Sequence, residues 1–206
     1  MAGNAPRHET QLAYHRRRMQ ELMSIRSPWE KTWQDLADYI EPSRYRPNMR
    51  QEGPMSRDKI TDSTGTFAWK TLASGMHSGI TSPARPWFRL TTYDPEMKDY
   101  GPVKNYLAQV EQRLREVFQK SNLYPAFHTG YGDIGQFGQS CSILAEHDTH
   151  MIRMQPLLHG TFWIARDENG VATTLYRKFR WSAQKIVAKF GYEKCSQPIQ
   201  SAYDQG

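Results

Sequence analysis

Cysteine is scarce in this chain, because Cys141 and Cys195 are the only two among 206 residues. Two cysteines so far apart in sequence do not provide the disulfide framework that stabilises many small secreted domains. The sequence therefore favours a reducing compartment, and we expect both thiols to be free.

Long apolar runs are absent as well. No segment approaches the roughly 18 consecutive apolar residues that a membrane span requires, and the first residues lack the apolar core of a signal peptide. The sequence also has no internal repeat and no low-complexity tract. We therefore expect a protein that is made and kept in the cytosol and has no membrane partner.

The sequence does contain enough apolar material for a folded core. Hydrophobic residues make up 38% of it and aromatic residues 12%, which excludes a disordered chain and suits one substantial domain or two small ones. The formal net charge of +6 is compatible with a polyanionic partner such as DNA. It is equally typical of an ordinary basic soluble protein, so charge alone assigns no function.

The stretch from Thr61 to Asp94 organises the rest of the chain. Its spacing predicts a helix from about Thr64 to Ile80, which Ser82-Pro83 ends, followed by an extended strand from Trp87 to Tyr93. Small residues line one face of the helix, and an interior glycine costs about 1 kcal/mol relative to alanine. We therefore expect the helix to be packed on two sides. One side is expected to contact another helix of the same subunit, and a neighbouring subunit is one candidate for the other side. Gly75→Leu would then overpack the site.

The chain before this stretch predicts an arm and two helices. Residues 1–10 are small and polar and predict a flexible arm, after which a basic helix continues to Arg26. The capping box Ser27-Pro28-Trp29-Glu30 predicts the sharp start of a second helix, which Pro42 ends. Trp29 and Trp33 lie one turn apart on its apolar stripe, which indicates buried core or a subunit interface.

Two clusters of arginine supply the candidate contact residues. One cluster lies in the basic helix and the other in a non-periodic loop from Arg44 to Asp58. The candidates are Arg16, Arg17, Arg18, Arg44, Arg46 and Arg50. Such clusters suit DNA phosphates or an acidic partner subunit. The alternative is a solvated helix face followed by a mobile surface loop.

The chain after this stretch changes from helical to alternating spacing near residue 140. Asp99 is expected to cap a helix over residues 103–118, and a glycine-rich segment continues to Gln139. Short extended runs follow at residues 141–146, 151–157, 162–166 and 171–180, with a hairpin signal at Asn169-Gly170. A last helix is expected over Ala183–Phe190, ended by Gly191. The pattern predicts an α+β fold: a helix-rich N-terminal part, then a small antiparallel β-sheet from Cys141 to Arg180.

Several apparent chemical motifs carry little weight. Residues 130–135 spell a dinucleotide fingerprint, but that motif needs a preceding strand, and here the preceding residues favour a helix. The DSTG at Asp62 lacks the second copy that an aspartic protease needs. The candidate metal ligands Cys141, His147, Asp148 and His150 match no closed zinc site, and a strand would direct His147 and His150 to opposite faces. We therefore expect no catalytic, cofactor or metal site.

The order of several short strings nevertheless resembles one family. The strings are DSTG, LASG, SPARPWF, SNLYPAFHTGYGDIGQFGQS and LYRKFRWSAQKIVAKFG. Together, from about residue 12 to residue 195, they resemble the head-to-tail connecting (portal) proteins of short-tailed, double-stranded DNA phages. Members of that family are considerably longer, so the resemblance implies that residues 11–206 form the N-terminal, wing-like region of such a protein.

The resemblance implies a mechanical function without bond chemistry. Such proteins form a ring, typically of twelve subunits, at one capsid vertex of the virion and are assembled in the host cytoplasm. The ring docks terminase, contacts capsid and tail or adaptor proteins, and lets double-stranded DNA pass during packaging and ejection. Because this region lies mainly in the outer wing, the resemblance implies that most of the six arginines serve subunit or capsid contacts and fewer meet DNA.

Two other function classes stay open at this point. A basic DNA-binding module unrelated to portals would bind as a monomer or dimer with strong salt dependence. An enzyme with an unrecognised site would show a pocket with strongly perturbed titratable groups. A portal subunit, in contrast, would form a cyclic homo-oligomer.

Overall fold

The structure is a computed structural model that describes residues 10–47 and 55–205. Its helices are α1 Gln11–Tyr39, α2 Thr64–Ile80, α3 Pro95–Lys98, α4 Gly101–Lys120, α5 Leu123–Phe137, α6 Ala183–Phe190 and α7 Gln197–Asp204, with 3₁₀ turns η1 Pro42–Arg44 and η2 Tyr192–Lys194. Its strands are β1 Ser142–His147, β2 Met151–Pro156, β3 Phe162–Arg166 and β4 Ala172–Arg177. The predicted α+β class, helical first and stranded after residue 140, is confirmed.

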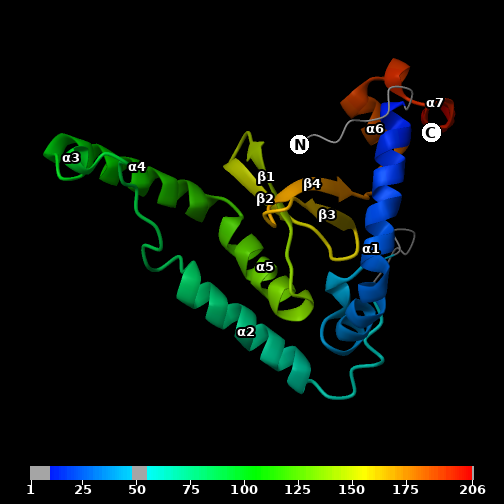
Figure 1. Ribbon diagram of the computed structural model, residues 1–206, viewed down its shortest axis with the longest axis horizontal. Coiled ribbons are helices and arrows are strands. Elements are labelled where there is room, and N and C mark those ends of the chain that lie inside the picture. The colour runs from blue at the N-terminus through cyan, green and yellow to red at the C-terminus, as the bar shows by residue number, and fades with distance from the viewer. Residues whose placement is uncertain (1–9, 48–54, 206) are drawn as a thin grey trace.

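Figure 1 shows an open arrangement of limbs rather than stacked layers. α1 stands at one end of the long axis, α4 and α3 extend to the other end, and α2 runs along a third side. α5 and the strands lie between these limbs. Among the described residues, no helix is both long and apolar enough to cross a membrane.

The strands form two separate antiparallel hairpins, so the prediction of one sheet is wrong. β1 pairs with β2, and β3 pairs with β4 across a turn in which Gly170 has φ 77°. The sheets do not join because residues 157–161 turn inward after β2. There the backbone N–H of His159 donates to Arg44 O at 3.0 Å, and its carbonyl accepts from Arg46 N at 2.8 Å. The loop after α1 thus takes the place that a further strand would occupy.

α1 is one continuous helix, so the predicted second start at Ser27 is wrong. Thr10 caps it by accepting a hydrogen bond from Ala13 N at 3.3 Å. Pro28 lies inside the helix, where proline removes the hydrogen bond to the carbonyl of Ser24. Pro28 and Ser24 are both exposed, so water can satisfy that carbonyl. The predicted arm over residues 1–10 falls almost wholly outside the described residues.

One helix start and one predicted strand also differ from the predictions. Asp99 ends α3 instead of capping α4, whose N-cap is Tyr100. Residues 87–93 pair with no strand in the described part of the chain. Trp87 and Phe88 instead pack on Phe118, with ring centroids 6.1 and 5.6 Å apart. Aromatic packing against α4 replaces the strand partner that this run lacks.

The C-terminal helices are partly as predicted. α6 begins after Ser182, whose side chain accepts from Lys185 N at 3.4 Å, and it ends at Gly191, which has φ 85°. Its predicted bounds are confirmed. α7 was not predicted, although Pro198 stands in its first turn, a position that proline favours.

A buried ion pair joins η1, which follows α1, to α5. Arg44 Nε donates to Asp133 Oδ1 at 2.8 Å, and Arg44 Nη2 donates to Asp133 Oδ2 at 2.5 Å. The two side chains are only 15% and 2% exposed. Burial raises the pKa of the Asp133 carboxyl, while the hydrogen bonds and the charge of Arg44 act in the opposite direction. Loss of either partner would leave the other charge buried without compensation.

His159 fills the space beside this ion pair as a neutral ring. It is 2% exposed, stacks on Phe137 with ring centroids 4.3 Å apart, and meets the edge of Trp33 at 4.3 Å. Neither ring nitrogen has a hydrogen-bond partner within the described ranges. Burial, followed by the charges of Arg26 and Arg44, lowers the pKa of His159 to about 3.

α2 is held through α5, and the small residues that allow the contact belong to α5. Trp69 Nε1 donates to Gly132 O at 2.7 Å, and a Cβ at Gly132 would lie 2.7 Å from Trp69 Cζ2. A Cβ at Gly135 would lie 2.7 Å from Leu72 Cδ2. A Cβ at Gly75 would have nothing within 4 Å. One packed side of α2 is therefore confirmed, and the second is not found in the described part of the chain.

Gly132→Ala should lower the free energy of unfolding by about 1–3 kcal/mol, because the new methyl group overlaps a tryptophan ring that is held by a hydrogen bond. Gly75→Ala is the matched control and should leave stability unchanged or raise it by up to about 1 kcal/mol. Urea denaturation followed by tryptophan fluorescence measures both. Equal stability of Gly132→Ala and the unmodified chain would contradict the close contact.

His159 should make stability fall as the pH is lowered. Its pKa is about 3 in the folded chain and ~6.5 in an unfolded one, so below ~6.5 only the unfolded chain takes up the proton. The free energy of unfolding should then drop by up to about 1.4 kcal/mol per pH unit until the folded pKa is reached. His159→Phe should remove this slope and keep the stacking on Phe137, whereas the exposed control His150→Phe should retain the slope. An unchanged slope in His159→Phe would refute the buried neutral state.

Candidate interaction site

The three consecutive arginines of α1 lie near its exposed start. Arg18 Nη1 donates to Glu21 Oε2 at 2.9 Å, and Arg17 Nε lies 4.0 Å from Glu21 Oε1. The Arg17 guanidinium carbon also lies 5.9 Å from the centroid of the Tyr14 ring. Arg16 is exposed, and the side chains of Arg17 and Arg18 are 51% and 39% exposed. Glu21 therefore offsets part of the charge, and the cluster stays accessible to a partner.

The second cluster is split by the fold. Arg44 is held inside the chain by Asp133. Arg46 is half-buried beside His159, and Arg50 lies outside the described residues. The structure thus gives Arg44 an internal role that the sequence did not indicate. A partner contact by any of the six candidate arginines stays a prediction.

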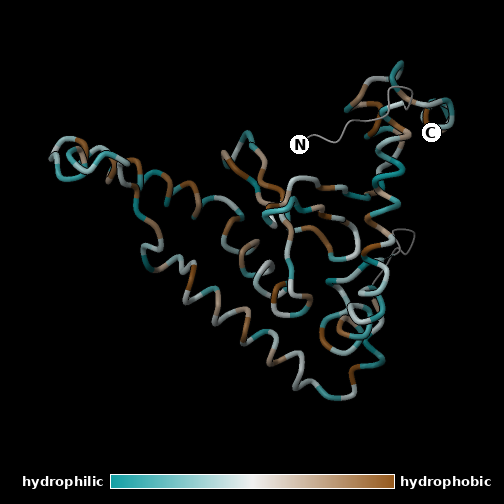
Figure 2. Tube along the Cα trace, viewed as in Figure 1, coloured by the Kyte–Doolittle hydropathy of each residue, from teal (hydrophilic) through white to brown (hydrophobic). Residues whose placement is uncertain are grey.

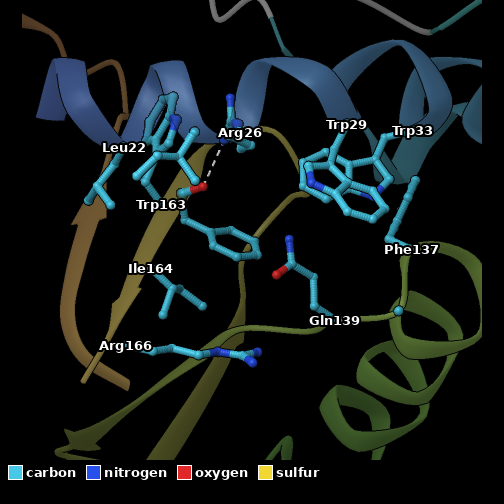
Figure 3. Close-up of a pocket in the computed structure, with 12 residues that line it drawn as sticks. Leu22, Arg26, Trp29, Trp33, Phe137, Gln139, Trp163, Ile164 and Arg166 are labelled. Atoms are coloured by element: carbon cyan, nitrogen blue, oxygen red, sulfur yellow. Dashed lines mark hydrogen bonds between the residues drawn. The ribbon is translucent and has the colours of Figure 1, made fainter. Parts of the chain in front are cut away.

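An aromatic groove of ≈ 590 Å³ lies between α1, the end of α5 and β3. It is lined by Leu22, Ile25, Arg26, Trp29, Trp33, Phe137, Gly138, Gln139, Phe162, Trp163, Ile164 and Arg166. Figure 3 shows the two tryptophans of α1 side by side, Trp163 and Ile164 on the strand, and Arg166 at the margin away from α1. We call this surface the α1–β3 groove.

Helical spacing and one arginine create the groove. Leu22, Trp29 and Trp33 recur on the face of α1 that turns to the strand. Arg26 lies among them, with its side chain 11% exposed, and donates to Phe162 O at 2.8 Å and to Glu30 Oε1 at 2.7 Å. This arginine fastens the helix to β3 and fixes the distance between the two walls.

The same arginine covers an aromatic ring of β3. The Arg26 guanidinium carbon lies 4.1 Å from the centroid of the Trp163 ring, which is the geometry of a cation–π contact. The indole N–H of Trp163 has no acceptor among the residues that the structure describes. The other β3 residues that line the groove are the apolar Phe162 and Ile164, with Arg166 at its margin.

The outer part of the groove exposes large apolar side chains. Trp29 is 60% exposed and Ile25 68% exposed, whereas Trp33 is 9% exposed. Trp29 and Trp33 stack with ring centroids 6.5 Å apart. Of the two tryptophans that the sequence placed on one stripe, Trp33 belongs to the core and Trp29 faces outward. Exposed tryptophan beside arginine is typical of residues that contribute strongly to protein interfaces.

The residues of the apparent chemical motifs lie in a helix, at a helix start and beside a turn. Residues 130–135 lie inside α5 rather than in a strand-to-helix loop, and Asp62 accepts a hydrogen bond from Thr64 N at 3.2 Å at the start of α2. The rings of His147 and His150 stack at 5.3 Å because a turn connects them, so their expected opposite directions are wrong. Within residues 10–47 and 55–205, no group of three or more His, Cys, Asp or Glu side chains could hold a metal ion.

Sequence reasoning missed Arg26 and Asp133, the two charged residues that organise this region. Arg26 looked like the end of a basic helix. Asp133 was considered only as part of a glycine motif, although it stands among the buried residues of α5. A lone carboxylate in such a stretch is a signal for a buried cationic partner, because an unpaired buried charge is strongly unfavourable.

The chain as a whole exposes a large surface. Its accessible area is 15301 Å², whereas a compact monomer of 24.0 kDa would expose ~9,900 Å². Large apolar side chains are exposed on every limb, and Figure 2 shows hydrophobic positions recurring along α2 and α4, which extend away from the strands. Examples are Phe67 at 65%, Ile80 at 54% and Tyr106 at 65% exposure.

Comparison with known proteins gives consistent results. The family described as bacteriophage head to tail connecting protein matches residues 13–206. The portal protein of Salmonella phage epsilon15 is 38% identical over 192 residues, which are 92% of this chain and 34% of that protein. The probable portal protein of Bordetella phage BPP-1 is 39% identical over 188 residues, which are 90% of this chain and 34% of that protein.

This chain therefore spans about a third of the length of these two relatives. The family match, in contrast, extends over nearly all of the chain, from the first turn of α1 through α7. The resemblance inferred from the short sequence strings is thus confirmed, and the chain belongs to the bacteriophage head-to-tail connecting proteins.

Proposed function

We propose that this chain is the wing-like part of a portal subunit, several copies of which form a ring at one vertex of a phage capsid. The observation that carries the proposal is the family match over residues 13–206, together with two relatives that are named as a portal protein and a probable portal protein. The ring is the passage through which the DNA genome is packaged and later ejected.

The shape of the chain supports an assembling subunit. Its surface exceeds that of a compact monomer, and its apolar side chains are exposed on separate limbs rather than in one patch. Oligomers that close into rings use two different surfaces of each subunit, one for each neighbour. Limbs that extend in several directions suit this arrangement.

The partners follow from the same proposal. The ring, of about twelve subunits if it is like the rest of the family, contacts capsid protein, terminase, and tail or adaptor proteins. It is located in the virion and assembled in the host cytoplasm. The proposed role is mechanical, without bond chemistry or a cofactor, as the resemblance to the family implies. Within the chain, the buried charged groups Arg44, Asp133 and Arg26 hold elements together.

The arginines of α1 fit contacts with neighbouring subunits or capsid protein better than contacts with DNA. Arg17 and Arg18 share Glu21, which reduces the local positive potential that attracts a polyanion. Arginine also pairs well with carboxylates at protein interfaces. DNA contact is a minor role for this cluster.

The experiment measures ring formation and DNA retention separately. The intact subunit that contains this chain should assemble into rings, which mass photometry and electron microscopy detect. Replacing Arg16, Arg17 and Arg18 by alanine should reduce ring or procapsid assembly more than DNA retention in the rings that do form. The control variant K104A/R113A/K120A removes the same charge from α4 and should assemble normally.

A subunit that stays monomeric under all conditions would contradict the portal proposal. Normal assembly of the α1 triple variant with loss of DNA retention would instead leave the ring in place and assign these arginines to the DNA path.

A further inference from the structure

The end of the molecule opposite α1 is an acidic tip with exposed apolar side chains. The tip, residues 93–100, contains α3 and lies at the far end of the long axis from α1 (Figure 1). Its apolar side chains are open to solvent, with Tyr93 at 105%, Met97 at 45% and Tyr100 at 56% exposure. Nothing else in the described part of the chain covers this tip.

The tip is acidic within a basic chain. It has three carboxylates, Asp94, Glu96 and Asp99, and one lysine, Lys98. Asp94 caps α3 by accepting from Glu96 N at 3.0 Å. The carboxylates of Glu96 and Asp99 make no ion pair with any described residue. These two charges are therefore available to a cationic partner.

The α1–β3 groove has the complementary character. Its lining contains two arginines and no carboxylate. Glu30 partly neutralises Arg26, but Arg166, which is exposed at the margin of the groove, has no ion-pair partner among the described residues. The exposed Ile25 and Trp29 supply apolar surface beside these charges. A ligand that suits this groove carries apolar or aromatic side chains next to a carboxylate.

We propose that the α3 tip of one copy of this chain docks in the α1–β3 groove of the next copy. Aromatic and methionine side chains of the tip pack on Trp29 and Ile25, and Glu96 and Asp99 face Arg166. Methionine adapts well to irregular apolar surfaces. The inference rests on the proposed ring and specifies which two surfaces join neighbouring subunits.

The position of the two surfaces favours a second copy over contact within one chain. The tip lies at the far end of the long axis from α1, which forms one wall of the groove, so one molecule cannot bring the two together without rearranging (Figure 1). Joining the tip to the groove of another copy leaves one free tip and one free groove at the ends of every open oligomer. Such a head-to-tail contact closes into a ring when the rotation between neighbouring copies allows it, as the proposed ring requires, and otherwise extends into an open filament.

Cross-linking tests whether the two surfaces meet. In the intact subunit with Cys141→Ser and Cys195→Ser, one preparation carries Met97→Cys and the other carries Ile25→Cys. Mixed and treated with a short bismaleimide, they should give a covalent dimer that neither preparation gives alone. A subunit with both substitutions should give a ladder of oligomers. The control pair Met97→Cys with Lys189→Cys, which places the second thiol on α6, should give no product.

Charge exchange tests the polar part of the contact. Glu96→Lys together with Asp99→Lys should weaken self-association by about tenfold or more, because like charges then face each other at Arg166. Arg166→Glu should weaken it similarly, and combining all three substitutions should restore it. Analytical ultracentrifugation measures each variant, and circular dichroism checks that each is folded.

The outcomes separate this inference from the portal proposal. Suppose that the unmodified subunit forms rings. If the tip and the groove then give no cross-link, or if the charge variants assemble normally, the docking inference alone is overturned. Failure of the unmodified subunit to form any ring would overturn the proposed function as well. Cross-linking of the groove to a different protein, such as capsid protein, in place of the tip would also refute the inference.

Discussion

The ion pair between Arg44 and Asp133 is the interaction on which the arrangement of the limbs depends. Arg44 follows α1, and Asp133 belongs to α5, which in turn holds α2 through Gly132 and Trp69. The backbone of the same loop binds His159, which leads directly into β3. Three parts of the chain that are distant in sequence therefore meet at one desolvated pair of charges. The walls of the α1–β3 groove are positioned by this junction and by Arg26.

An open subunit of this kind has a small core relative to its surface. The buried apolar clusters of the described residues are centred on Trp33, which belongs to α1, and on Trp163 of β3, which packs against Leu22 of α1. The outer limbs, in contrast, expose apolar side chains that a free monomer would not leave in water over such an area. Stability at the junction and the proposed association at the limbs thus depend on different residues. This division suits a protein whose final structure forms only in an assembly.

The sequence predicted those elements whose signals are local. α2 and α6 have the predicted bounds, and the turn at Gly170 joins two antiparallel strands as expected. The predictions that failed concern features that depend on contacts between distant parts of the chain. The predicted second helix does not start at Ser27, because Arg26 and Trp33 hold α1 on both sides of Pro28. The pairing of Arg44 with Asp133 links residues 89 positions apart, so no periodicity could reveal it. The groove depends on that long-range geometry and was likewise not predicted, although the family was.

A double-substitution cycle on Arg44 and Asp133 measures most directly how strongly the fold depends on this ion pair. Arg44→Met and Asp133→Leu should each lower the free energy of unfolding by about 3–5 kcal/mol, because each leaves a buried charge unpaired. The double variant, which has no buried charge at this place, should lose much less than the sum of the two single losses. Denaturant unfolding gives all four values. Single losses within about 0.5 kcal/mol of zero, as expected for ordinary surface substitutions, would contradict the central role of this ion pair.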